Sequence, residues 1–159
     1  MTMICFDVGN ICFNYRVAGI ALRANQVLLN RAEDQNFWFL PGGRVEMGET
    51  AIEALRREMQ EEVREEVEVG RLLWMNENFF KGEEKLYHEL GFYYLMSFAT
   101  DSSAYRADES FFAQEGQTRM VFQWFSLDEL DHVRLYPSFL VQGLRALPEQ
   151  PVHVLVDER

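Results

Sequence analysis

Residues 41–65 read PGGRVEMGETAIEALRREMQEEVRE, and this stretch decides the architecture of the chain. Thr50, with Glu53 three residues later, is typical of a capping box at the start of a helix. Apolar residues then recur at helical spacing from Ile52 to Val63 and form a stripe that would face a core. The stretch therefore predicts a glycine loop that leads into one amphipathic helix.

Three carboxylates lie on one flank of this helix, beside its apolar stripe. Glu58, Glu61 and Glu62 are at positions i, i+3 and i+4, where like charges destabilise a helix. Two carboxylates about 4 Å apart repel by roughly 4 kcal/mol at an effective dielectric constant of about 20. Divalent cations between them would remove this cost, and Mg²⁺ prefers oxygen ligands. A run of glutamates is more often a solvated face, but the preceding glycine loop favours a cation site here.

The remainder of the chain alternates between strand-like and short helical segments. Residues 100–117 are polar and predict a long loop. We expect one domain over residues 1–159, with an α/β (α+β) fold in which a mixed sheet lies between helices. The predicted strands are 3–7, 10–24, 27–31, 67–80, 88–99, 120–125 and 152–156, with a turn at Asn25-Gln26 and short helices at 126–130 and 137–146.

The composition limits the classes of partner. The 159 residues carry a formal net charge of −11, and 48% of them are hydrophobic, which is typical of a folded globular protein. The acidic balance argues against binding to a nucleic-acid backbone, which needs clustered Lys and Arg. Cys5 and Cys12 are in strand-like sequence and are expected to be free thiols.

The location is predicted from the absence of targeting signals. No basic start precedes an apolar run, and no stretch reaches about 18 apolar residues. Neither a signal peptide nor a transmembrane helix is therefore expected. We expect a cytoplasmic protein with no membrane partner.

The spacing of the charged residues resembles a known family motif. Gly43 is followed after five residues by Glu49, and seven further residues lead to the segment 57–62, Arg-Glu-Met-Gln-Glu-Glu. This pattern is similar to the box G-x5-E-x7-R-E-U-x-E-E-x-G-U of the Nudix hydrolases, the MutT-like enzymes, where U is a bulky apolar residue. Segments 38–43 (WFLPGG) and 124–130 (WFSLDEL) also resemble this family, so the likeness extends from about residue 15 to residue 130.

The resemblance implies a Nudix-type α/β/α sandwich and a metal-dependent hydrolysis. Members of this family use Mg²⁺ or Mn²⁺ to hydrolyse a nucleoside diphosphate linked to another moiety. The markers of several subfamilies are missing, so a nucleoside triphosphate, an oxidised nucleotide and a nucleotide sugar all remain open as the small-molecule substrate. Many members are dimers, which makes a homodimer a further expectation. The alternative function is a non-catalytic Nudix module that binds a nucleotide as a sensor.

The resemblance also assigns roles to the box residues. Glu58, Glu61 and Glu62 would be metal ligands, and one of them would act as the base. Arg57 would orient a catalytic carboxylate with its bidentate guanidinium group. Gly42, or Gly43 beside it, would offer a backbone carbonyl to the metal.

A further glutamate from a distant loop often completes the site in this family. Glu115 is the preferred candidate for both a metal-binding and a catalytic role, because it is in the predicted polar loop before the strand that contains Trp124. Glu89, at the start of the strand predicted for 88–99, is the second candidate.

Two positions depart from the family's pattern. Arg64 replaces the glycine that would stop the helix in a left-handed conformation, and Glu65 replaces the last apolar residue. We expect the helix to end near these residues. Either the helix continues slightly or Arg64 accepts the strained conformation.

Overall fold

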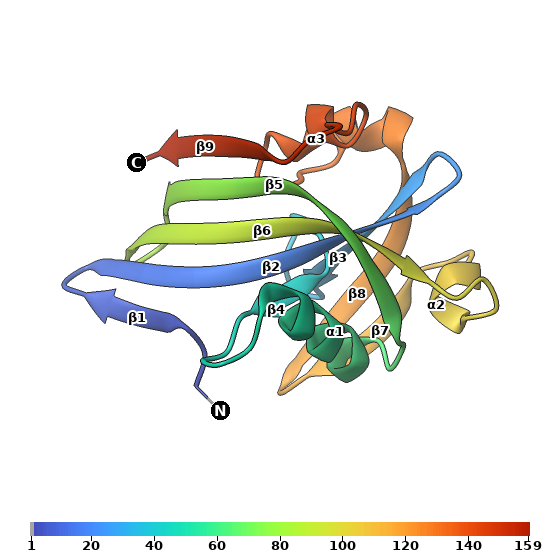
Figure 1. Ribbon diagram of the computed structural model, residues 1–159, viewed down its shortest axis with the longest axis horizontal. Helices are drawn as coiled ribbons and strands as arrows, with labels where there is room; N and C mark the ends of the chain where they lie inside the picture. Colours follow the sequence, from blue (N-terminus) through green and yellow to red (C-terminus); the bar gives the residue numbers. More distant parts are fainter. Residues whose placement is uncertain (1) are drawn as a thin grey trace.

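Strand β2 (Ile11–Arg23) runs through the middle of a nine-stranded sheet in the computed structural model, which describes residues 2–159 (Figure 1). The strand order is β7-β8-β3-β2-β6-β5-β9, and β1 and β4 also pair with β2. The β2–β6 and β5–β9 pairs are parallel and the other pairs are antiparallel, so the predicted mixed sheet is confirmed. The other strands are β1 (Cys5–Val8), β3 (Gln26–Ala32), β4 (Gly42–Arg44), β5 (Val67–Lys81), β6 (Leu86–Phe98), β7 (Phe111–Glu115), β8 (Thr118–Ser126) and β9 (Val152–Glu158).

Helix α1 (Ala51–Glu62) begins at the predicted capping box. The Thr50 hydroxyl accepts a hydrogen bond from the backbone N–H of Glu53 at 3.2 Å, and the Glu53 carboxylate accepts one from the backbone N–H of Thr50 at 2.7 Å. These contacts satisfy donors that a helix start leaves without partners.

The end of α1 comes earlier than predicted. Val63 is already the C-cap, and Arg64 has a φ of 62°, in the left-handed region that usually favours glycine. Of the two alternatives for this position, the strained arginine is therefore the one observed. Glu65 accepts hydrogen bonds from the backbone N–H and the hydroxyl of Ser103, at 3.1 and 2.9 Å. The residue that replaces the family's apolar contact thus connects the exit of α1 to the segment around Ser103.

Two apolar clusters pack on opposite faces of the sheet. On one face, Leu55 and Met59 of α1 pack with Val17 of β2, and all three are fully buried. On the other face, Ile20 of β2 packs with Leu130 and with the segment around α3 (Leu140–Gly143). Residues 17 and 20 differ in parity, and successive strand residues point to opposite faces. The sheet therefore lies between helices, which confirms the predicted fold class.

The segment 100–117 is not the long loop that was predicted. It contains the short helix α2 (Ser103–Arg106) and the edge strand β7, which pairs with β8. Phe111 stacks on Phe122 with ring centroids 5.3 Å apart, and Phe111 and Ala113 both pack against the core on the α1 face, which holds β7 in place. The exposed positions of β7 are mostly polar, which hid the strand in the sequence.

The turns and short helices also differ in detail from the predictions. Arg23 pairs with Gln26, so the β2–β3 turn consists of Ala24 and Asn25, and Ala24 takes a φ of 49°. The predicted helix at 126–130 is the 3-10 helix η1 (Leu127–His132), whereas the one at 137–146 contains only the single turn α3. No helix within residues 2–159 has the length and apolar character needed to cross a lipid bilayer.

Candidate active site

A cleft of about 370 Å³ opens between α1, β4 and the β7–β8 hairpin. Its polar lining contains two glutamates from α1, one from the end of β7 and two arginines from β2 and β4. The capping box fixes the start of α1, and the short strand β4 pairs with the middle of β2 directly before it. The charged lining residues are Arg16, Arg44, Glu58, Glu62 and Glu115.

The glycines before α1 allow a close approach of the helix. A Cβ atom built on Gly43 would lie 2.2 Å from the carboxylate carbon of Glu58. A Cβ atom on Gly42 would lie 2.0 Å from the carbonyl oxygen of Val17 in β2. Any side chain at position 43 would therefore occupy the space that the Glu58 carboxylate fills.

Glu62 is a buried carboxylate with an unpaired oxygen. The residue is 5% exposed, and its Oε2 atom has no hydrogen-bond partner. Burial raises the pKa of Glu62 to about 9, and the negative charges of Glu115 and Glu58 act in the same direction. Arg16 opposes this increase. At Glu62, burial and the two neighbouring carboxylates thus outweigh the opposing charge of Arg16.

Arg57 connects three box residues. Its Nη2 and Nε atoms donate to the two oxygens of Glu49 at 2.7 and 3.2 Å, and its Nη1 atom donates to Glu58 at 2.9 Å. A bidentate guanidinium–carboxylate pair fixes direction as well as distance. Arg57 also lowers the pKa of Glu49, whereas burial outweighs Arg57 at Glu58 and raises the pKa of that carboxyl. Arg57 therefore holds Glu58 from one side while leaving it partly desolvated.

The predicted site residues separate into three groups. Glu58, Glu62 and Glu115 come together, since the charge of Glu115 raises the pKa of both helix carboxyls. The Glu61 side chain is 61% exposed at the edge, 3.4 Å from Arg57. Glu89 accepts a hydrogen bond from Asn14 at 3.0 Å and lies outside the cleft lining.

Arg16 is a charged residue of the cleft that lies outside the box. It is half-buried in β2, and no carboxylate within residues 2–159 forms an ion pair with it. Arg44, its partner across the β2–β4 ladder, instead donates to Asn14 at 2.9 Å. Several arginines are in strand-like sequence, and the register of β2 against β4 is what places Arg16 in the cleft.

The donors in the cleft fit a hard divalent cation. Carboxylate oxygens are the ligands that Mg²⁺ and Mn²⁺ accept, and the unpaired Oε2 atom of Glu62 has a coordination position free. Within residues 2–159, no three acidic, histidine or cysteine side chains already surround one point as ligands. Glu58, Glu62 and Glu115 are the cleft carboxylates that would hold such a cation.

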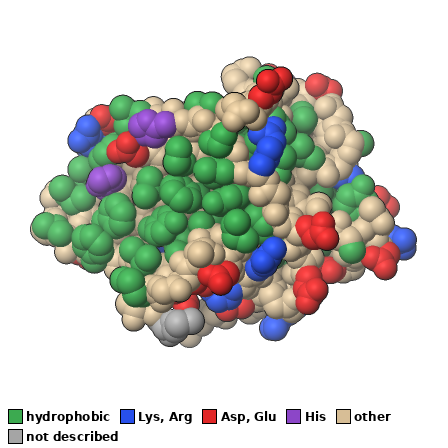
Figure 2. Space-filling view, viewed as in Figure 1, with side chains coloured by type: hydrophobic (Ala, Val, Ile, Leu, Met, Phe, Trp, Pro, Cys, Tyr) green, Lys and Arg blue, Asp and Glu red, His purple; other side chains and the backbone are tan. Residues whose placement is uncertain are grey.

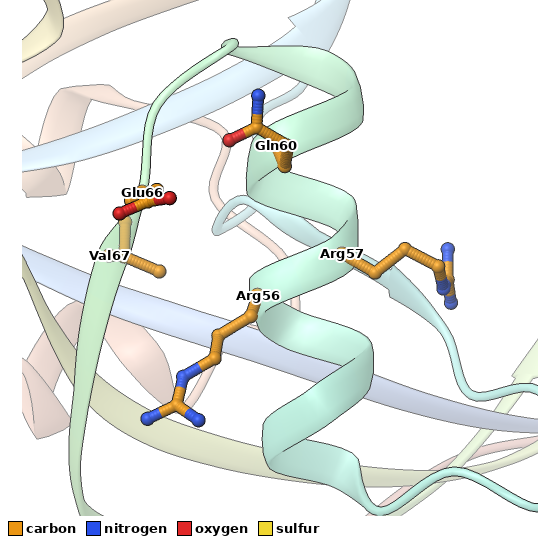
Figure 3. Close-up of a pocket in the computed structure, with 5 residues that line it drawn as sticks. All are labelled: Arg56, Arg57, Gln60, Glu66 and Val67. Atoms are coloured by element: carbon orange, nitrogen blue, oxygen red, sulfur yellow. The ribbon is translucent and has the colours of Figure 1, made fainter.

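A second hollow, of about 480 Å³, lies on another side of α1. Figure 3 shows Arg56 on the side of α1 that faces Glu66 and Val67, whereas Arg57 extends from the opposite side of the helix. The hollow contains one exposed glutamate and none of the buried carboxylates. It therefore lacks the charge accumulation of the carboxylate cleft.

Comparison with solved structures shows where this fold occurs. A UDP-X diphosphatase is similar over 89% of this chain and 66% of its own, with a TM-score of 0.59 and 21% identity. A NUDIX hydrolase from Nitrosomonas europaea is similar over 83% of this chain and 86% of its own, with a TM-score of 0.60 and 19% identity. Both comparisons support the predicted fold.

Comparison of sequences identifies the family of the chain. Over 70 residues, the chain is 36% identical to the human 8-oxo-dGDP phosphatase NUDT18. This aligned stretch is 43% of this chain and 22% of the human protein. The model of the NUDIX domain matches residues 14–142. Residues 1–13 and 143–159 lie outside this match, so one domain over residues 1–159 stays a prediction. Because the matched span contains the box, the glycine loop and the carboxylate cleft, the chain belongs to the Nudix family.

Proposed function

We propose that this protein is a divalent-metal-dependent pyrophosphohydrolase that acts on a nucleoside diphosphate linked to another moiety. One observation carries the proposal: Glu62 is buried beside Glu58 and Glu115 with an oxygen that has no partner. A buried carboxylate without a partner destabilises a fold. A cation and a phosphorylated substrate in the cleft would compensate for it.

The proposed cation site consists of the carboxylates of Glu58, Glu62 and Glu115. When bound, Mg²⁺ or Mn²⁺ would neutralise phosphate oxygens and acidify a water molecule. Glu61 and the carbonyl of Gly42 remain predicted ligands at the edge of this group. Glu61 is exposed and would reach the cation from the solvent side.

The other cleft residues have separate proposed tasks. Arg57 positions Glu58 through the clamp that it shares with Glu49. Arg16 faces the carboxylates without an ion-pair partner, so its guanidinium is free to bind a phosphate oxygen. Glu62 or Glu115 accepts a proton from the attacking water as the general base.

The substrate is proposed as a class. The printed names of similar proteins are 8-oxo-dGDP phosphatase, UDP-X diphosphatase and, for a Streptococcus suis structure, ADP-ribose pyrophosphatase. All three names denote a nucleoside diphosphate or its derivative. Nucleoside triphosphates, oxidised nucleotides and nucleotide sugars are therefore the panel to screen. A cytoplasmic location is part of the same proposal.

The test is hydrolysis of this panel with Mg²⁺, with Mn²⁺ and with a chelator. We expect metal-dependent turnover of at least one nucleotide and its loss in Glu62→Gln and Glu58→Gln. Glu68→Gln is the matched control, because Glu68 is exposed on β5. Full activity of Glu62→Gln would contradict the proposal. Nucleotide binding without turnover in the wild-type protein would instead support the sensor function.

A further inference from the structure

Two cysteines lie in contact across the hairpin of β1 and β2. The Sγ atoms of Cys5 and Cys12 are 3.6 Å apart, and both residues are free thiols. The register of the hairpin explains this contact. Phe6 pairs with Phe13, and each cysteine is the sequence neighbour of one member of that pair. Because successive strand residues point to opposite faces, the two thiols share the face of the hairpin that the phenylalanines leave.

The apolar side chains of β1 anchor this strand weakly. Figure 1 shows β1 at the margin of the sheet beside β2. Phe6 and Val8 are 55% and 67% exposed, and Figure 2 shows hydrophobic side chains gathered on the surface of this half of the sheet. The contact between the Phe6 and Phe13 rings, with centroids 5.2 Å apart, is therefore a surface contact. A strand with few buried contacts opens locally more readily than the core.

The residue before Cys5 is bonded to the loop that leads into α1. The backbone N–H of Ile4 donates to the carbonyl oxygen of Val45 at 2.8 Å. In the same loop, the backbone N–H of Glu46 donates to the carboxylate of Glu49 at 2.7 Å. Glu49 is the carboxylate that holds Arg57. A restraint on β1 therefore acts next to the loop that positions this pair.

The two thiols differ in access and in acidity. Cys5 is half-buried, whereas Cys12 is 6% exposed. Burial raises the pKa of Cys12 to about 11, and the neighbouring groups of Cys5 and Asp7 act in the same direction. The Cys12 thiol thus keeps its proton near neutral pH. A dissolved oxidant reaches the sulfur of Cys5 first, and Cys12 is the thiol beside it.

We propose that Cys5 and Cys12 are a redox modification site, which forms an intramolecular disulfide when a low-molecular-weight disulfide acts as the oxidant. The Cys5 sulfur attacks one sulfur of the oxidant, whose S–S bond breaks, and one half leaves as a thiol with the Cys5 proton. The Cys12 sulfur then attacks the Cys5 sulfur and displaces the second half, which leaves with the Cys12 proton. The two protein thiols give up two electrons, and the oxidant is reduced to two thiols.

Closure of this disulfide needs a small movement of β1. Bonded sulfur atoms lie about 2.05 Å apart, so the two Sγ atoms must approach by about 1.5 Å from their 3.6 Å separation. Rotation about the Cα–Cβ bonds and a shift of β1 supply this approach. The bond closes the loop 5–12 and fixes β1 on β2. In a reducing compartment such a bond is transient, so it forms in response to oxidation.

The site is tested by treating the reduced wild-type chain with oxidised glutathione. Intact mass spectrometry should show the loss of two hydrogen atoms and no added glutathione. Cleavage at Asp7, between the two cysteines, should give two peptides that stay joined until dithiothreitol separates them. Amide hydrogen exchange of residues 2–8 should slow by about tenfold or more in the oxidised chain, because the link opposes local opening of β1.

Cys12→Ala is the matched variant, because it keeps Cys5 and removes its partner. It should retain one glutathione on Cys5, without the slower exchange of residues 2–8. Cys5→Ala should take up no glutathione while folded, because Cys12 is buried. Unreacted thiols, a stable glutathione adduct on the wild-type chain, a disulfide between two chains, or unchanged exchange after oxidation would overturn the proposal. Mass and exchange are measured without a nucleotide, so the outcome is independent of the proposed hydrolysis.

Discussion

The carboxylate of Glu58 occupies the position that a side chain on Gly43 would need. The 2.2 Å separation between a Cβ atom at position 43 and the Glu58 carboxylate carbon is too short for both to be accommodated. Gly43→Ala should therefore displace Glu58 and reduce kcat at least tenfold, with a loss of about 1 to 3 kcal/mol in stability. Steady-state kinetics and thermal unfolding measure the two effects.

Gly70→Ala is the control for this substitution. A Cβ atom on Gly70 would lie 3.4 Å from the nearest atom, which is an ordinary contact. This variant should retain activity. If Gly43→Ala is as active as Gly70→Ala, the close approach of Glu58 has no catalytic importance.

The metal-free protein should become less stable as pH rises. The pKa of Glu62 is about 9 in the folded protein, against an ordinary value of 4.5, so the folded protein holds a proton that the unfolded chain has lost between these values. The contribution of Glu62 is complete below about pH 4.5 and is lost as pH increases toward 9. Glu62→Gln should remove this decline and raise stability at pH 8 by about 1 to 3 kcal/mol.

Urea unfolding in the presence of a chelator, at pH 5 and pH 8, measures this difference. Adding Mg²⁺ should stabilise the wild-type protein more than Glu62→Gln, because ligand binding favours the folded state. Parallel pH profiles for both proteins would show that Glu62 is not the group responsible.

Replacing Arg57 by Lys should reduce kcat by about 10- to 100-fold. Lysine keeps the positive charge but cannot hold both oxygens of Glu49 while contacting Glu58. Glu49→Gln should give a smaller loss, because the contact between Arg57 and Glu58 remains. Equal activity of Arg57→Lys and wild type would mean that charge alone is sufficient at this position.

Glu115 and Glu89 should respond differently to substitution by Gln. Glu115 acts on Glu58 and Glu62 through its charge, whereas Glu89 is held by Asn14. We expect Glu115→Gln to lose about tenfold or more in kcat, in the range of a positioned base, and Glu89→Gln to retain most activity. The opposite order would assign the distant glutamate of the site to β6.

Substituting Arg16 should affect substrate binding more than turnover. Removing its guanidinium leaves a phosphate oxygen without a charged donor, a loss of about 1.5 to 3 kcal/mol, or roughly 10- to 100-fold in KM. Arg16→Lys should recover part of this loss. Arg56→Gln is the control, because Arg56 extends to the other side of α1 (Figure 3). An unchanged KM for Arg16→Gln would exclude a phosphate contact.

The features that could be predicted from the sequence are local ones. The capping box at Thr50 and Glu53 depends on residues three positions apart, and it is confirmed. The strand β7 was missed because its stability comes from pairing with β8 and from the contact of Phe111 with Phe122, which lies outside the polar segment 100–117. The strand propensity of residues 100–117 alone does not report that contact, because it depends on a residue of the neighbouring strand.

In the candidate site, too, the local features could be predicted and those that depend on distant strands could not. The spacing within the box places Glu58 and Glu62 on one flank of α1, but burial of the Glu62 carboxylate depends on how the β7–β8 hairpin and β2 close around it. The position of Arg16 in the cleft follows from the register of β2 against β4. Register is set by long-range pairing, and a shift of one residue would turn Arg16 to the other face.

The parallel pairing of β2 with β6 determines when the centre of the sheet can form during protein synthesis. Ile11 pairs with Leu86 and Ala21 with Met96, so the centre of the sheet forms only after about the first hundred residues have left the ribosome. Until then, β2 has an apolar strand edge without its final neighbour, and such edges favour aggregation in nascent chains. The slowest step of folding should therefore be closure of this distant pair, since contacts far apart in sequence form late.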